Sequence, residues 1–249
     1  MLIDFDLNNH NPWDYIKMKF KLLTLAVASV ISFSSVATTI DYRHEMKDTS
    51  KSDHKDRLLI SNRFANGFGL SLEGKWGQHS SDTTPNKPFN EQVSNGTEVV
   101  ASYVYKINKT FQVEPGFSLD STSDSNNYRP YLRGKVSFTD DFSTSLRYRP
   151  YYKRNQPAQT KKTEKGHEFT MLFAYNFLKD YSAEYELNYK KSEDEILANK
   201  EKYEWAHDVK IAYKWDKSWK PYVAIGNVPG SKSTDERQTR YRVGVQYTF

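Results

Sequence analysis

The sequence predicts an all-β protein, a 12-stranded antiparallel transmembrane β-barrel of the outer membrane. Three observations lead to this prediction: segments in which apolar and polar residues alternate, connections that are short and long in turn, and a polar composition rich in aromatic residues. The segment 238–249 shows the alternation clearly, because Tyr241, Val243, Val245 and Tyr247 are separated by single polar or small residues. A period of two places these side chains on one face of a strand.

The composition fits one large barrel domain better than a soluble or disordered chain. Only 37% of the 249 residues are hydrophobic, yet 15% are aromatic, with 18 tyrosines. This suits a thin apolar belt with aromatic girdles around a wet interior, and the aromatic content argues against disorder. The absence of cysteine excludes disulfides and thiolate chemistry. A net charge of +5 favours acidic partners.

Residues 18–37 carry the three parts of a secretory signal peptide. A basic stretch begins at Met18, an apolar run covers residues 22–33, and small residues precede an expected cleavage after Ala37. The apolar run is too short for a membrane-spanning helix. A secreted chain of this kind belongs in a Gram-negative envelope, where nucleic acid is not an expected partner.

Residues 38–249 are expected to form the barrel, and residues 1–17 an upstream extension or a start assigned too early. Most alternating segments span about ten to fourteen residues, the length of tilted membrane strands. The twelve expected strands are 39–47, 56–64, 67–77, 97–107, 111–120, 127–138, 142–153, 166–177, 181–191, 202–215, 219–228 and 238–249.

The connections between these segments alternate in length. Every second connection has two or three residues, as at Ala65-Asn66, whereas the others are longer and polar, such as 78–96. Short turns on one side and long loops on the other are typical of outer-membrane barrels. Both ends of the barrel domain would then lie on the periplasmic side, with the short turns.

Charge decides which face of each strand points inward. One face of 127–138 carries Arg129, Arg133 and Lys135, and the other is mainly apolar. A basic side chain facing lipid at mid-membrane costs about 2–4 kcal/mol, so reversing this strand would cost on the order of 6 kcal/mol. We therefore expect the charges inside. Bulges are expected at four prolines within strands, because proline removes a ladder donor. These are Pro115, Pro130, Pro150 and Pro221.

The sixth, seventh and last expected strands bring basic residues and no acid to the inward face. These basic residues are Arg129, Arg133, Lys135, Arg147, Arg149, Lys153, Arg240 and Arg242. Such a wall offers guanidinium forks to the carboxylates of an anionic solute, through many weak sites that permit release. Alternatively, inward acids from other strands neutralise these charges and hold the barrel open.

Four stretches carry a family resemblance: Ile40-Asp-Tyr-Arg-His-Glu45, Tyr128-Arg-Pro-Tyr-Leu-Arg133, Leu146-Arg-Tyr-Arg149 and Tyr241-Arg-Val-Gly-Val-Gln-Tyr-Thr-Phe249. By their order and strand positions the chain resembles the oligogalacturonate-specific porin family, the KdgM type with its sialic-acid porin relative. The resemblance implies a monomeric 12-stranded channel in which two facing basic tracks pass acidic oligosaccharides. It maps these tracks to Arg43, Arg129, Arg133, Lys135, Arg147, Arg149, Arg240 and Arg242.

These observations predict a channel for passive, anion-selective diffusion of acidic oligosaccharides, without enzymatic activity, cofactor or metal. Expected partners also include outer-membrane lipid, lipopolysaccharide and the barrel-assembly machinery, which would recognise the strand ending in Phe249. The alternative is a lipid-modifying hydrolase on the same scaffold. It would need a Ser–His–acid group at one rim, with His44, His167 or His207 as the base.

Overall fold

The computed structural model describes residues 38–48, 53–79, 87–156 and 163–249, so the predicted signal peptide and the residues before it lie outside the described part. Within these ranges no helix has the length and apolar character needed to cross a membrane. The strands are β1 (Thr38–Lys47), β2 (His54–Arg63), β3 (Phe68–Gln78), β4 (Gln92–Tyr103), β5 (Tyr105–Lys106), β6 (Phe111–Ser121), β7 (Ser125–Ser137), β8 (Phe142–Asn155), β9 (Glu164–Phe177), β10 (Tyr181–Ser192), β11 (Tyr203–Tyr213), β12 (Trp219–Pro229) and β13 (Arg237–Thr248).

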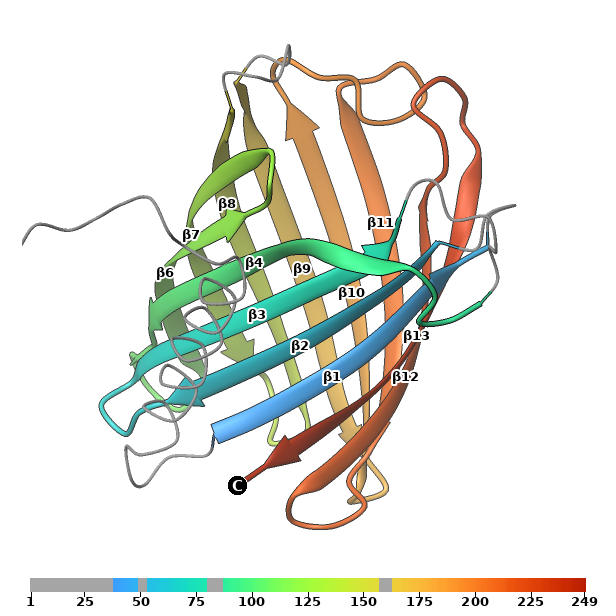
Figure 1. The fold of residues 1–249 in the computed structure, drawn as a ribbon. Coiled ribbons are helices and arrows are strands. Elements are labelled where there is room, and N and C mark those ends of the chain that lie inside the picture. Colours follow the sequence, from blue (N-terminus) through green and yellow to red (C-terminus); the bar gives the residue numbers. More distant parts are fainter. Residues whose placement is uncertain (1–37, 49–52, 80–86, 157–162) are drawn as a thin grey trace, which may run out of the picture.

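The strands form one antiparallel sheet that closes on itself (Figure 1). β1 pairs with both β2 and β13, and β4 pairs with both β3 and β6. The two-residue β5 continues β4 after a break at Val104, so the ring is a barrel of twelve strands, as predicted. The chain end lies beside the start of β1, where the Phe249 amide donates to the Thr38 carbonyl at 3.0 Å. Each of these twelve described strands therefore has a hydrogen-bonded neighbour on both sides over at least part of its length.

The largest boundary difference from the sequence prediction lies at the fourth strand, which begins at Gln92 instead of residue 97. The expected loop 78–96 is therefore shortened to 79–91. Residues 92–97 are polar or small on both faces apart from Val93, so no alternation marks them as a strand. Their backbone nevertheless pairs with β3, for example Ser94 with Trp76.

The prediction of bulges at the four prolines is wrong. Pro115 and Pro221 have cross-strand partners in unbroken registers, and the β7–β8 register is the same on either side of Pro130 and Pro150. Proline removes one backbone donor but adds no residue, so a ladder can lose a hydrogen bond and keep its register. Among the described strands, the register shift lies beside Trp76, between β3 and β4.

The barrel has apolar residues outside and charges inside, which confirms the predicted orientation. Leu132 and Val223 face outward and are 52% and 59% exposed. In contrast Asp41, Glu45 and Asp208 face inward and are buried. A soluble protein reverses this arrangement, whereas a barrel with a lipid-facing apolar band and a polar lumen requires it.

Inward tyrosines lie flat on glycines of the neighbouring strand. Tyr131 is paired with Gly116 and Tyr222 with Gly244, and a Cβ atom on either glycine would overlap the tyrosine ring. The tyrosine hydroxyls reach inward carboxylates, as Tyr222 does by donating to Asp41 at 2.8 Å. These pairs fill the wall between strands while leaving the centre of the lumen to charged side chains.

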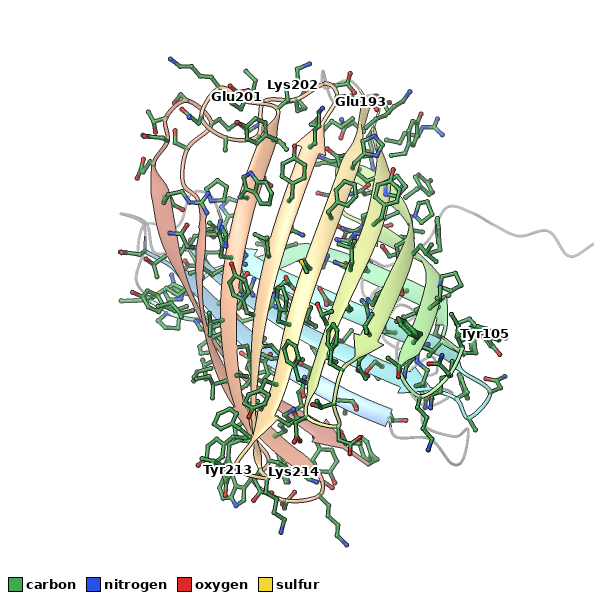
Figure 2. The ribbon with its side chains drawn as sticks, turned by 180° about the vertical axis from the view of Figure 1, so that it is seen from behind. Tyr105, Glu193, Glu201, Lys202, Tyr213 and Lys214 are labelled. Atoms are coloured by element: carbon green, nitrogen blue, oxygen red, sulfur yellow. The ribbon has the colours of Figure 1, made fainter. Side chains whose placement is uncertain are left out.

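The two ends of the barrel differ in the length of their connections. Figure 2 shows Glu193, Glu201 and Lys202 at one end, in the long β10–β11 connection, and Tyr213 and Lys214 at the other, where a short turn leads to β12. The alternation expected from the sequence is found at the other connections of the barrel but not between β6 and β7, where residues 122–124 form a turn as short as those at the opposite end. Hydrogen bonds from Thr248 to Ser218 and from Phe249 to Thr38 place both ends of the barrel beside the short turns, the end that the sequence predicts to be periplasmic.

Candidate functional site

The predicted basic residues form two walls that face each other across the lumen. The β7–β8 wall carries Arg129, Arg133, Lys135, Arg147, Arg149 and Lys153, and the β13–β1 wall carries Arg43, Arg240 and Arg242. Between β1 and β8 lie β2, β3, β4, β6 and β7 in one direction and β13, β12, β11, β10 and β9 in the other. The strands on either path are five in number, so the two walls lie half a turn apart.

Carboxylates from neighbouring strands compensate the β7–β8 wall. Arg149 forms an ion pair of 2.7 Å with Glu168 of β9. Arg133 forms one of 3.2 Å with Glu114 of β6, which also accepts the Tyr131 hydroxyl. The absence of acids from the sequence of this wall is thus offset by the strands on either side of it.

The β13–β1 wall is compensated in the same way. Arg242 lies 2.8 Å from Glu45 of β1 and 3.3 Å from Asp208 of β11, and Arg240 also pairs with Asp208. Burying such charges is costly unless they are paired and hydrogen-bonded, and removing one partner leaves the other uncompensated. The acids that organise both walls are at inward parity in the sequence, but alternation alone does not tell which arginine each one meets.

Two of the cavities in the lumen lie against the arginines of opposite walls. The larger, of about 590 Å³, is lined by Arg133, Arg147 and Arg149 of the β7–β8 wall. The smaller, of about 250 Å³, is lined by Arg43 and Arg242 of the β13–β1 wall. Arg57 of β2 lines both. The lumen therefore offers guanidinium groups on opposite sides of a water-accessible space large enough for a small polar solute.

The three rim histidines all face outward. His167 and His207 contact tyrosine hydroxyls of adjacent strands, at 2.8 and 2.7 Å. His44 contacts Asp56 at 2.9 Å through Nδ1 and His54 at 3.0 Å through Nε2. Within the described ranges, none of these three histidines hydrogen-bonds a serine hydroxyl, which is the group that the hydrolase alternative needs. No cluster of three or more histidine and acidic side chains suited to a metal is found there either.

Comparison with known proteins assigns the chain to a protein family. The family model described as "Oligogalacturonate-specific porin protein (KdgM)" matches residues 31–249. The chain belongs to this family. The oligogalacturonate-specific porin KdgM of Dickeya dadantii (strain 3937) is 64% identical over 236 residues, which cover 93% of this chain and 100% of the relative. The family resemblance expected from the four sequence stretches is therefore confirmed.

Solved porin structures share the fold. The KdgM porin is 55% identical, with a TM-score of 0.66 over 85% of this chain and 99% of that chain, and it was also solved in complex with disordered oligogalacturonate. The NanC porin has a TM-score of 0.71 over 84% of this chain and 100% of that chain, at 19% identity, which speaks for the fold alone. The chain is thus a porin of the Gram-negative outer membrane. The relatives in its family are channels and not enzymes.

Proposed function

We propose that this porin passes acidic oligosaccharides, oligogalacturonates or similar uronate or sialate sugars, by passive and anion-selective diffusion. The observation that carries the proposal is the pair of arginine-rich walls half a turn apart around the lumen. Guanidinium groups bind carboxylates as bidentate forks, so a sugar acid meets a partner on either side. The names of the relatives support the same substrate class.

The substrate-binding residues in this proposal are the predicted ones: Arg43, Arg129, Arg133, Lys135, Arg147, Arg149, Lys153, Arg240 and Arg242. At each arginine in turn, a carboxylate of the solute would replace the protein's own carboxylate as the ion-pair partner. The charge around each arginine would then change little as the solute passes. Because each arginine already has or nearly has a carboxylate partner, every solute site stays weak. Translocation requires binding strong enough for entry and weak enough for release. No covalent step and no cofactor are needed.

The same proposal includes the oligomeric state of the barrel, its lipid contacts and its assembly. The protein works as a monomer whose aromatic outer belt contacts outer-membrane lipid and lipopolysaccharide. Among these aromatics are Tyr189 and Trp205 near the extracellular end, with ring centroids 4.5 Å apart, and Trp219 and Tyr247 near the periplasmic end, 4.8 Å apart. The last strand, ending in Phe249, would be the segment that the barrel-assembly machinery recognises.

Single-channel current in planar bilayers tests the proposal. Purified protein without residues 1–37 is titrated with trigalacturonate and, as a control, with a neutral trisaccharide. We expect an anion preference in KCl and a block of the current by trigalacturonate alone, relieved in part by Arg129→Ala. A silent or cation-preferring barrel, or equal block by both sugars, would exclude an acid-selective porin.

A further inference from the structure

Two pairs of arginines stand directly opposite each other in the sheet register. Arg43 of β1 is the partner of Arg57 of β2, and Arg133 of β7 is the partner of Arg147 of β8. Like charges in directly opposed positions destabilise a sheet. The β1–β2 and β7–β8 pairs lie on opposite sides of the ring, so one directly opposed arginine pair stands on each side of the lumen.

Within each pair one arginine is well compensated. Arg57 has two carboxylates at 3.3 Å, from Asp41 and Glu73. Arg133 forms a hydrogen-bonded ion pair with Glu114 at 3.2 Å. These carboxylates neutralise one guanidinium of each pair and hold it in place.

The other arginine of each pair is poorly compensated. In the described part of the chain, the ion pair of Arg43 is with Glu45 at 3.8 Å, and that of Arg147 is with Glu168 at 3.7 Å. Both carboxylates are engaged more closely elsewhere. Glu45 lies 2.8 Å from the Nε of Arg242, and Glu168 lies 2.7 Å from Arg149.

The Nε atoms of Arg43 and Arg147 are buried without a hydrogen-bond partner. The same holds for Arg57 and Arg149, so it is the longer ion pairs that set the first two side chains apart. Arg147 donates to the neutral Thr170 hydroxyl at 3.0 Å, which supplies no charge. The side chains of Arg43 and Arg147 are 22% and 21% exposed, and they line the smaller and the larger cavity respectively. Each guanidinium group therefore borders a lumen cavity, with its carboxylate partner no nearer than 3.7 Å.

We propose that Arg43 and Arg147 are the specificity-determining pair of this channel, each taking one carboxylate of an oligosaccharide that carries at least two. This inference rests on the proposed function and narrows its basic walls to one residue on each side. The other inward arginines of the two walls with short carboxylate contacts, such as Arg149 and Arg242, then hold the wall together. A monosaccharide acid can occupy one site at a time, whereas an oligosaccharide engages both, with the shared Arg57 between the two cavities.

Block by trigalacturonate and by galacturonate, together with urea unfolding of the barrel in detergent, tests the pair. In Arg43→Gln and in Arg147→Gln, we expect the half-blocking concentration of trigalacturonate to rise about tenfold or more. The ratio between the half-blocking concentrations of galacturonate and trigalacturonate should decrease in the same variants. The urea midpoint should stay constant or rise in both variants, because each substitution removes a like-charge contact.

Arg149→Gln and Arg242→Gln are the matched variants, since each lies near one proposed residue and on the same wall. We expect a lower urea midpoint in both, because Glu168 or Glu45 loses its closest cation. Their block should weaken less than that of Arg147→Gln or Arg43→Gln. Equal weakening in all four variants would overturn the inference and indicate a binding field spread over the walls. If the wild-type channel shows no acid-selective block, the proposed function itself fails.

Discussion

At the residue scale, the packing of the lumen wall depends on inward tyrosines that lie over glycines of the neighbouring strand. Tyr131 occupies the room that a side chain on Gly116 would fill, and its hydroxyl reaches Glu114 at 3.0 Å. Glu114 in turn receives Arg133 and Arg63. A single glycine thus supports a group of four interacting side chains on one face of the wall.

Gly116→Ala should destabilise the barrel by about 1–3 kcal/mol, because the new methyl group overlaps the Tyr131 ring and moves it away from Glu114. Urea unfolding in detergent micelles measures the loss. Gly134→Ala is the control, because a Cβ atom there meets nothing within 4 Å. Equal stability of the two variants would show that the tyrosine yields without cost.

Glu168→Gln should also lower the free energy of unfolding, by about 1–3 kcal/mol. The change leaves Arg149 without its 2.7 Å carboxylate, and an uncompensated, largely buried cation is costly. It should at the same time raise the anion preference measured from reversal potentials in a KCl gradient. Glu193→Gln, at an exposed position of the β10–β11 connection, serves as the control. An unchanged reversal potential would contradict the role assigned to Glu168.

At the element scale, strand parity is what keeps arginines out of the membrane. β13 pairs with β1 from Thr248 to Arg240 without a shift, and every second residue of β13 faces the lumen. Because the side-chain period of a strand is two, a slip of one residue would move the whole inward set to the lipid face. Where a register is unbroken, as between β13 and β1, a change in strand length therefore preserves the inward set only if it comes in pairs of residues.

Inserting one alanine between Gly244 and Val245 should prevent folding. With Phe249 held at the β1 seam, the insertion turns Arg240 and Arg242 toward lipid, at about 2–4 kcal/mol for each at mid-membrane. Loss of heat-modifiable migration on gels after refolding into vesicles reports the failure. A two-alanine insertion at the same place restores parity and should fold in larger yield. Folding of both insertions with equal yield would show that parity in β13 is not decisive.

At the scale of the whole molecule, the barrel places opposed charges around a narrow, wet lumen. Electrostatic interactions in such a space are shielded by mobile ions, with a Debye length of about 10 Å at 0.1 M salt and 3 Å at 1 M. Recognition of a carboxylated sugar through guanidinium groups should therefore depend on ionic strength. Recognition through hydroxyl groups should not.

Raising KCl from 0.1 to 1 M should increase the half-blocking concentration of trigalacturonate by about tenfold or more, because salt competes at each arginine. Any block by a neutral trisaccharide should change by less than about twofold over the same range. Current fluctuations in planar bilayers give both values. A salt-independent block by trigalacturonate would mean that the walls do not act through charge.

Much of this fold is determined locally, and the sequence alone predicts it. Alternation identifies strands such as β10 and β13, connection length separates the two ends of the barrel, and the cost of charge in lipid turns Arg129 and Arg133 inward. These signals lie within single segments. They fail where a strand leaves the apolar belt, as at the start of β4, and they misjudge prolines, which cost a hydrogen bond but not the register.

Only the tertiary structure decides how the inward charges are shared. In the sequence, Arg43 and Arg242 are equivalent inward arginines on expected strands. In the barrel, Arg242 meets Glu45 at 2.8 Å, while Arg43 stands opposite Arg57 and keeps its nearest carboxylate partner at 3.8 Å. Register and closure set these distances, since they bring together strands that are far apart in the chain. Parity places a charge in the lumen, but the neighbouring strands determine whether it remains free for a solute.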